Sequence, residues 1–133
     1  MANPFLPGAT KLFRRLVTPA DFAVLNGQLI HELLSTFALG RDMEWTSRQF
    51  VEEMLEPGEA GIGTGLEIEH RGPAFAGETV EFTATFEVLR GPELTCTLRA
   101  AVGSRLVATG RTRQRIVPVG RLPRPPAATS SAA

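Results

Sequence analysis

A histidine closes the apolar face of one predicted strand. In the segment GTGLEIEH, alternation places four side chains on one face of a half-buried strand: Thr64, Leu66, Ile68 and His70. A third aliphatic residue would be easier to bury than an imidazole, and an imidazole takes up and releases protons near neutral pH. His70 is therefore a candidate for general acid–base catalysis, and the competing interpretation is a structural histidine with satisfied hydrogen bonds.

Thr36 and Glu44 precede this strand in a segment where apolar residues recur at helical spacing. On a helix the two side chains are about 80° apart, so both can face the end of the sheet where His70 lies. Taken alone, each has a structural interpretation. Thr36 would be the N-cap where a helix restarts, and Glu44 would be a solvated carboxylate or the ion-pair partner of Arg41 or Arg48.

The elements that position these side chains follow from the hydrophobic period. The segment KLFRRLVTPADF predicts an edge strand stopped by Pro19, and three- and four-residue spacing predicts one helical region from Phe22 to Pro57, with a break near Ser35 as an alternative. From Gly61 onward, alternation predicts four strands joined by turns. This order predicts an α+β domain with an antiparallel sheet around one long helix, the hot-dog architecture, although periodicity equally allows other single-helix sandwiches.

Composition indicates one globular domain. The chain has 133 residues, 43% of them hydrophobic, which is enough for a core of its own. The formal net charge is +0 and no basic run is interleaved with aromatic residues, which argues against a nucleic-acid partner. We expect residues 1–10 to form a flexible N-terminus, residues 11–119 the domain, and residues 120–133 a disordered tail rich in Pro, Ala and Ser.

The cysteine content and the lack of long apolar runs suggest a location. Cys96 is the single cysteine, which excludes an internal disulfide and a Cys-based zinc site and suits a reducing compartment. No apolar run approaches the length of a membrane span, and the N-terminus lacks a signal-peptide pattern. We therefore expect a cytoplasmic protein with no membrane partner, and a site with neither a metal nor a cofactor.

Two adjoining motifs identify a family resemblance. The run MEWTSRQFVEEMLEPGE, followed by GIGTGLEIEH, closely resembles the fluoroacetyl-CoA thioesterase type of hot-dog thioesterase, with the same spacing throughout. The similarity covers roughly residues 17–117. It implies hydrolysis of an acyl thioester of coenzyme A or acyl carrier protein to free acid and thiol. It also implies four site residues: catalytic Thr36, Glu44 and His70, and substrate-contacting Gly63.

The implied roles agree with what thioester hydrolysis requires, namely a positioned nucleophile or water, a base and a stabilised oxyanion. Glu44 either attacks the acyl carbon or activates water, His70 moves the proton, and Thr36 donates a hydrogen bond. The backbone N–H of Gly63 binds the thioester oxygen, although glycine here can also simply let another backbone approach. Two other functions remain open: a non-catalytic hot-dog module that binds an acyl chain or a partner, and a hot-dog dehydratase, whose Asp-His pair the sequence lacks.

The sequence departs from the family in three places. Phe37 follows the catalytic threonine where the family has glycine, so we expect this ring to narrow or redirect the acyl pocket. The last strand has Thr112 and Gln114 at the inward positions where the family has a His-x-Arg pair, so we expect Gln114 to line the substrate site. The stretch between Val17 and Thr36 looks shorter than the family's aromatic lid, and selectivity for fluorine is therefore not expected.

Two features predict contacts with other molecules. A hot-dog sheet with one helix leaves an unpaired edge and an apolar margin, and pairing two edges removes both, so we expect a homodimer. The last strand also has an outward row of arginines, which either contacts coenzyme A phosphates or keeps this sheet face solvated: Arg111, Arg113 and Arg115.

Overall fold

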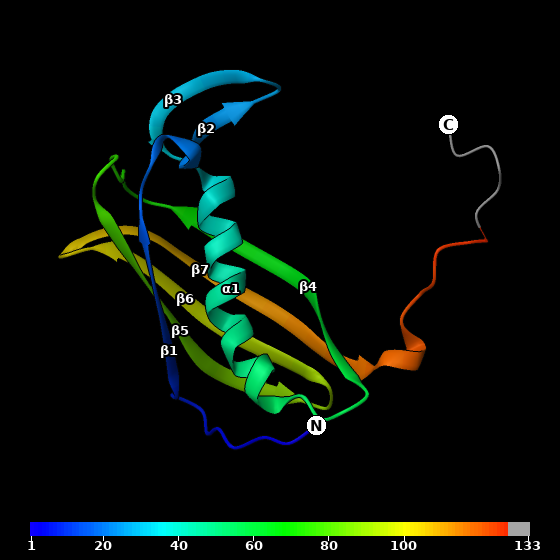
Figure 1. The fold of residues 1–133 in the computed structure, drawn as a ribbon. Helices are drawn as coiled ribbons and strands as arrows, with labels where there is room; N and C mark the ends of the chain where they lie inside the picture. The colour runs from blue at the N-terminus through cyan, green and yellow to red at the C-terminus, as the bar shows by residue number, and fades with distance from the viewer. Residues whose placement is uncertain (128–133) are drawn as a thin grey trace.

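The computed structural model of the protein describes residues 1–127. A five-stranded sheet lies against one long helix, and a two-stranded hairpin projects beyond the N-terminal end of that helix (Figure 1). The elements in chain order are β1 (Thr10–Leu16), η1 (Pro19–Asp21), β2 (Phe22–Leu25), β3 (Gln28–Leu34), α1 (Thr36–Met54), β4 (Glu59–His70), β5 (Thr79–Arg90), β6 (Glu93–Val102), β7 (Arg105–Pro118) and η2 (Val119–Arg121).

The sheet has the order β1-β5-β6-β7-β4, and each neighbouring pair is antiparallel. The strands β1 and β4 form its two edges, which confirms the edge strand predicted before Pro19. Helix α1 packs across one face and contacts all five strands (Figure 1). The predicted hot-dog arrangement of the α+β class is confirmed.

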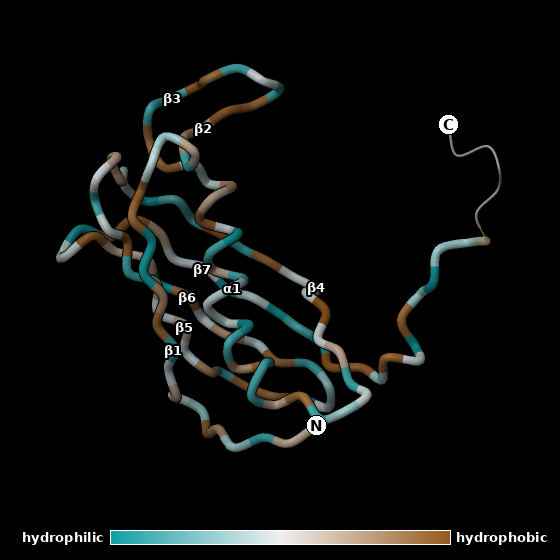
Figure 2. Tube along the Cα trace, in the orientation of Figure 1, coloured by the Kyte–Doolittle hydropathy of each residue, from teal (hydrophilic) through white to brown (hydrophobic). Residues whose placement is uncertain are grey.

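The core forms where the predicted apolar faces meet. Hydrophobic and hydrophilic positions alternate along the strands (Figure 2), and burying one large apolar side chain stabilises the fold by about 1.5–3 kcal/mol. The large apolar side chains that α1 buries are Leu39, Met43, Phe50, Val51 and Met54, and those facing them from β5 and β6 include Val80, Phe82, Phe86, Leu94 and Leu98. This layer holds α1 in a fixed rotation about its axis, which decides which helical residues face β4.

The segment before α1 differs from the prediction. Residues 22–34 form the hairpin β2–β3, and the helix begins only at Thr36, at the alternative break. The turn contains Asn26 and Gly27 with φ of 50° and 75°, the left-handed conformations that this dipeptide favours in tight hairpins. The three- and four-residue spacing through Leu29 and Leu33 fits both structures over so short a segment, so the prediction of one helical region was wrong here.

The N-terminal segment packs against the body of the domain. Phe5 packs edge to face on Phe50, with ring centroids 4.9 Å apart, and the backbone N–H of Ala2 donates to the carbonyl of Met54 at 3.0 Å. The division into a flexible segment 1–10, a domain 11–119 and a disordered tail 120–133 stays a prediction. The last part of that tail, residues 128–133, lies outside the described residues.

Two further features concern the helices and the single cysteine. Within residues 1–127, no helix is long and apolar enough to cross a membrane. Cys96 is a free thiol on β6, and burial raises its pKa to about 12. A thiol with this pKa is almost entirely protonated at neutral pH, so Cys96 belongs to the core and has no nucleophilic role.

Candidate functional site

The start of α1 brings a hydroxyl to the end of β4. Ser35 is the N-cap of α1, because its Oγ accepts a hydrogen bond from the backbone N–H of Ala38 at 3.0 Å. The interpretation of Thr36 as the N-cap is therefore wrong. Thr36 Oγ1 lies 2.9 Å from Nδ1 of His70, and both side chains are exposed. The tautomer of the imidazole decides which of the two groups donates.

A β-bulge sets which residues of β4 face the helix. The register of β4 on β7 shifts between Gly63 and Gly65, which leaves Thr64 as the bulged residue outside the predicted alternation. Strict alternation puts Gly63 and His70 on opposite faces, but the extra residue reverses the phase between them. Both therefore face α1: His70 contacts its first turn, and a Cβ on Gly63 would lie 3.5 Å from Oε1 of Glu44.

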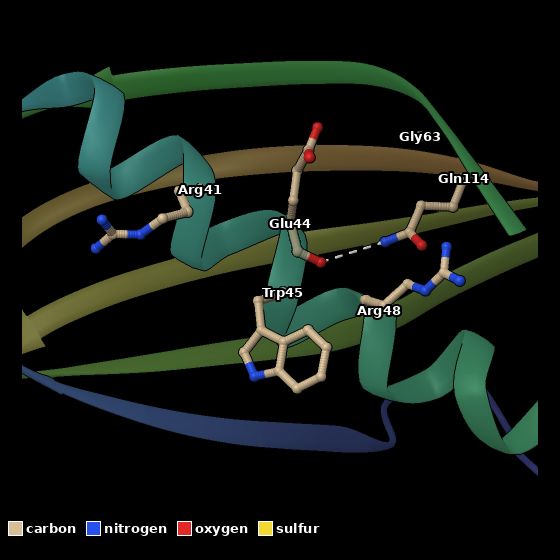
Figure 3. A pocket seen from close by; sticks show the side chains of 6 residues that line it. All are labelled: Arg41, Glu44, Trp45, Arg48, Gly63 and Gln114. Atoms are coloured by element: carbon tan, nitrogen blue, oxygen red, sulfur yellow. Dashed lines mark hydrogen bonds between the residues drawn. The ribbon is translucent and has the colours of Figure 1, made fainter.

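Glu44 lies two turns further along α1, at the border of two grooves. One groove, of about 500 Å³, runs between α1 and β4 and has Thr36, Phe37 and Glu44 in its wall. The other has Gly63 and Gln114 beside Glu44, whose carboxylate points toward β4 (Figure 3). Among residues 1–127, this carboxylate has no hydrogen bond and no ion pair. A carboxylate without partners is available to a substrate or a water molecule.

The two arginines expected to pair with Glu44 both bind elsewhere. Arg41 makes its ion pairs with Asp42 and Asp21, and Arg48 makes its ion pair with a glutamate one turn further on and donates to the carbonyl of Gly61. In Figure 3 the carboxylate of Glu44 points away from both guanidinium groups. The ion-pair interpretation of Glu44 is therefore wrong.

Gln114 lies beside this site but is bound to the helix. Its Nε2 donates to Ser47 Oγ at 2.8 Å, and Ser47 Oγ in turn donates to the carbonyl oxygen of Glu44 at 3.1 Å. Gln114 is directly opposite Gly63 in the β4–β7 pairing. In the described part of the chain, Gln114 Oε1 and Thr112 Oγ1 are buried without hydrogen-bond partners. The predicted substrate-binding residue therefore also fixes the helical turn that carries Glu44.

Phe37 is the most exposed large apolar side chain of this region. It is 82% exposed and lies in the groove wall next to Thr36, while Trp45 and Leu66 are 48% and 40% exposed. These side chains make the surface between α1 and β4 apolar. The position of Phe37 agrees with the expected pocket wall, and its effect on an acyl group stays a prediction.

The outward arginines of β7 lie on the opposite face of the sheet from α1. Arg111 pairs with Glu87 at 3.2 Å, and Arg113 pairs with Glu67 at 3.1 Å. Two of the three predicted arginines thus have carboxylate partners and lie away from the grooves beside the helix. The interpretation of a solvated sheet face agrees better with this arrangement than a role in phosphate binding.

The sequence interpretation missed a third groove. His31 and Leu33 from the hairpin and Pro73 line it together with Thr36 and His70. His31 falls within the predicted helical region, whereas the structure places it as an exposed residue of β3 that borders the Thr36–His70 pair. The Asn-Gly dipeptide was the signal that would have identified the hairpin and hence this groove.

The arrangement supplies the parts of acid–base and nucleophilic chemistry. A hydroxyl and an imidazole in hydrogen-bond contact can relay a proton, and the unpaired carboxylate of Glu44, in a groove that Thr36 also lines, can act as base or nucleophile. Within residues 1–127, no group of three or more His, Cys, Asp or Glu side chains could hold a metal ion.

Comparison with known proteins gives one family match. A family model described as fluoroacetyl-CoA-specific thioesterase matches residues 17–120. No curated protein matches the chain.

Several solved structures have the same fold. A thioesterase superfamily member from Thermus thermophilus has a TM-score of 0.84 and 28% identity, over 88% of this chain and 87% of that one. The fluoroacetyl-CoA thioesterase FlK has a TM-score of 0.80 and 21% identity, over 87% of this chain and 90% of that one. A mutant of FlK in complex with fluoroacetate and CoA matches equally well, with a TM-score of 0.80 and 21% identity over 87% of this chain and 98% of that one.

Proposed function

Because the chain belongs to the family of fluoroacetyl-CoA-specific thioesterases, and is thus a thioester hydrolase, we propose that Thr36, Glu44 and His70 form its catalytic site. The observation that carries this proposal is the 2.9 Å contact between Thr36 Oγ1 and His70 Nδ1, since Thr36 also lines the groove that has the unpaired carboxylate of Glu44 in its wall. Sequence position alone does not require a threonine at the start of α1 to contact the histidine at the end of β4.

In the proposed reaction, Glu44 supplies the electron pair that starts cleavage. It either attacks the acyl carbon, forming an anhydride that water then hydrolyses, or removes a proton from the water that attacks. In both routes the C–S bond breaks, the sulfur leaves as the thiol after taking a proton, and the acyl group leaves as the acid. His70, whose ring lies against the Thr36 hydroxyl, transfers that proton.

Gly63 is proposed to bind the thioester oxygen through its backbone N–H. A backbone donor beside Glu44 stabilises the negative charge that develops on the oxygen when the carbonyl is attacked. A Cβ on Gly63 would meet Glu44 at 3.5 Å, which is an ordinary contact, so the protein itself has room for a methyl group. The methyl group would instead occupy the space over the carboxylate that a substrate needs.

The proposed substrates are acyl thioesters of coenzyme A, with acyl carrier protein as the alternative carrier. The complex of the FlK mutant with CoA supports coenzyme A for this family. Selectivity for a fluorinated acyl group is not part of the proposal, because the exposed apolar residues of the hairpin are aliphatic: Val24, Leu25, Leu29 and Ile30. We also propose that the enzyme is cytoplasmic, since its cysteine is a free thiol.

The proposed assembly is a homodimer joined along β4. This twelve-residue strand is an edge of the sheet, and an unpaired edge tends to pair with another strand. Apolar side chains beside it are exposed, among them Ile62 at 36% and Leu66 at 40%. Pairing two copies would cover both the edge and these side chains, and would close the grooves beside α1.

The test is thiol release from a panel of short, branched and aryl acyl-CoAs, with Glu44→Gln as the inactive control. We expect turnover of at least one substrate by the wild type and loss of about 10²-fold or more in the variant. Binding of acyl-CoA without release of thiol would indicate a non-catalytic acyl-binding module and would contradict the proposal.

A further inference from the structure

The position of Glu44 on α1 raises the question of why its carboxylate has no ion pair. Residues three before and four after a given position are its neighbours on a helix surface, and an arginine there ordinarily pairs with a glutamate. Arg41 and Arg48 occupy these two positions, and both line the groove that contains Glu44. The distance along the helix therefore does not prevent pairing, and something else must hold the guanidinium groups.

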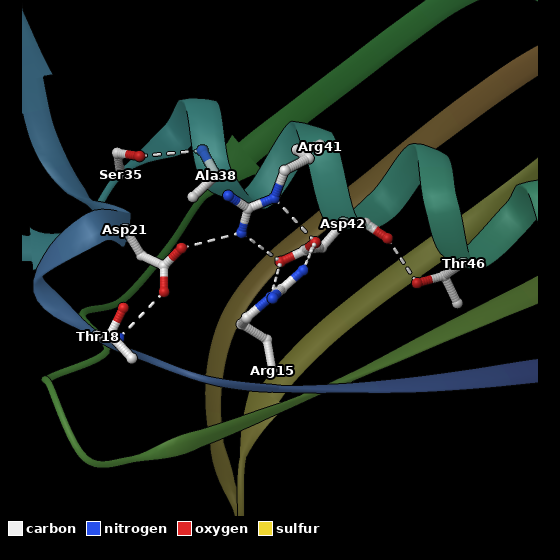
Figure 4. Close-up of polar contacts among 8 residues, drawn as sticks. All are labelled: Arg15, Thr18, Asp21, Ser35, Ala38, Arg41, Asp42 and Thr46. Atoms are coloured by element: carbon white, nitrogen blue, oxygen red, sulfur yellow. Dashed lines mark hydrogen bonds and ion pairs between the residues drawn. The ribbon is translucent and has the colours of Figure 1, made fainter.

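Arg41 is held by two buried carboxylates (Figure 4). Its Nε lies 3.1 Å from Oδ1 of Asp42, and its Nη2 lies 2.9 Å from Oδ2 of Asp42 and 3.0 Å from Oδ1 of Asp21. Asp42 and Asp21 are 1% and 5% exposed. A guanidinium bound through Nε and through both hydrogens of Nη2 has a fixed direction, and here it points away from the carboxylate of Glu44 (Figure 3).

Asp42 also binds a second arginine from the edge strand β1. Arg15 donates from Nε at 3.1 Å and from Nη2 at 2.9 Å. Burial alone would raise the pKa of Asp42, but the hydrogen bonds from Arg41 and Arg15 outweigh it and lower that pKa. The hydrogen bond to Asp42 likewise raises the pKa of Arg41. Asp42 and the two guanidinium groups that bind it are therefore charged at neutral pH.

We propose that Asp42 is a positioning residue that, together with Asp21, holds the guanidinium of Arg41 away from Glu44 and so keeps the catalytic carboxylate unpaired. The inference rests on the proposed function of Glu44. A guanidinium on that carboxylate would occupy the oxygen lone pairs and weaken them as a base and as a nucleophile. Asp42 and Asp21 thus keep Glu44 reactive without contacting it.

The decisive experiment compares Asp42→Asn with the double variant Asp42→Asn/Arg41→Gln, using acetyl-CoA as the probe and kcat as the readout. The asparagine side chain would have an NH2 group in place of one of the two oxygens of Asp42 that accept from Arg41, and it would carry no charge. The guanidinium of Arg41 is then released and can pair with Glu44. We expect kcat to fall about fivefold, as for a partly exposed ion pair. Removing Arg41 as well should restore kcat to within about twofold of Arg41→Gln alone. A double variant no more active than Asp42→Asn would overturn the proposal.

Arg15→Gln is the matched control. It removes the other guanidinium from the same carboxylate but leaves Arg41 bound, so we expect a lower melting temperature with kcat within about twofold of wild type. A purely structural role for Asp42 predicts equal losses in Arg15→Gln and Asp42→Asn. If Asp42→Asn does not fold, Arg41→Lys and Arg41→Gln provide the test. Asp42 and Asp21 cannot hold a flexible ammonium in the fixed geometry of the guanidinium, so the lysine should pair with Glu44 more often. Arg41→Lys should therefore be the less active of the two variants, and the reverse order contradicts the proposal.

A crystal structure of Asp42→Asn separates this inference from the proposed function. The guanidinium of Arg41 should lie within hydrogen-bond distance of the Glu44 carboxylate, and an unmoved Arg41 refutes the inference even if the enzyme is active. If wild type hydrolyses no thioester, the proposed function fails, and this structural result still tests the positioning of Arg41.

Discussion

Ser35 and Thr36 are adjacent, and loss of their hydroxyl groups should affect different properties: stability for Ser35 and turnover for Thr36. Ser35→Ala removes the N-cap bond to Ala38, and loss of such a cap costs about 1 kcal/mol, or roughly 3–5 °C in melting temperature for a domain of this size. Thr36→Val keeps the shape of the side chain and removes only the hydroxyl that contacts His70. Because Thr36 is exposed and does not cap the helix, we expect little change in melting temperature.

The effect of Thr36→Val on turnover follows from the contact of 2.9 Å with Nδ1 of His70. When His70 takes up a proton during the reaction, the Thr36 hydroxyl is hydrogen-bonded to a charged ring. A hydrogen bond to a charged partner contributes about 1.5–3 kcal/mol, and each 1.4 kcal/mol changes a rate about tenfold. We therefore expect kcat/KM to fall between about 10-fold and 100-fold in Thr36→Val and to stay within about twofold of wild type in Ser35→Ala. The assay is thiol release with melting followed in parallel.

The reasoning would be refuted if the two variants exchanged their effects. Full activity in Thr36→Val would mean that the contact with His70 has no catalytic role. An equal loss of activity in Ser35→Ala would mean that the position of the whole helix terminus matters and that the hydroxyl of Thr36 has no separate function.

Four further outcomes follow from the structure. His70→Ala should lower kcat by about 10²–10⁴-fold with an unchanged melting temperature, since the side chain is exposed, and early melting with full specific activity contradicts this. Phe37→Gly should favour bulkier acyl groups in kcat/KM, and one common factor for all substrates would show that the ring does not contact the acyl group. Sedimentation at micromolar concentration should give a dimer, and a monomer would contradict pairing along β4. The hydrogen bond from Arg105 lowers the pKa of Glu78 to about 2. The pair therefore stabilises the fold at pH values above the pKa of Glu78 in the unfolded chain, and this stabilisation is lost as the pH falls toward 2. Glu78→Gln should lower the melting temperature at pH 7 but not at pH 2.

The sheet and the helix could be predicted because their signals are local. Alternation along β5 identifies Val80 and Phe82 as buried, and both are. The apolar spacing from Met43 to Met54 likewise matches the buried stripe of α1. The hairpin β2–β3 was missed because Leu29 and Leu33 satisfy helical spacing within a segment too short to distinguish the two periods.

The candidate site was only partly predictable. The family motifs point to Thr36, Glu44 and His70, but the bulge at Thr64 leaves no mark in the hydrophobic pattern, since glycines flank it on both sides. The ion pairs Arg15–Asp42 and Arg41–Asp21 join residues that are far apart in sequence, so they depend on tertiary packing, which sequence spacing does not encode. For the same reason the ion-pair alternative for Glu44 was wrong.

The bulge at Thr64 has a consequence for how this site tolerates insertions and deletions in its gene. Loss of the single codon for Thr64 would change no proposed catalytic residue, and the shortened strand could still pair with β7. Without the extra residue, regular alternation still places Gly63 and His70 on the face toward α1, because the partners of Gly65 to His70 on β7 stay the same. Loss of one codon between Gly65 and His70, with the bulge retained, would have the opposite effect: every proposed catalytic residue would remain, but the imidazole would point away from the threonine.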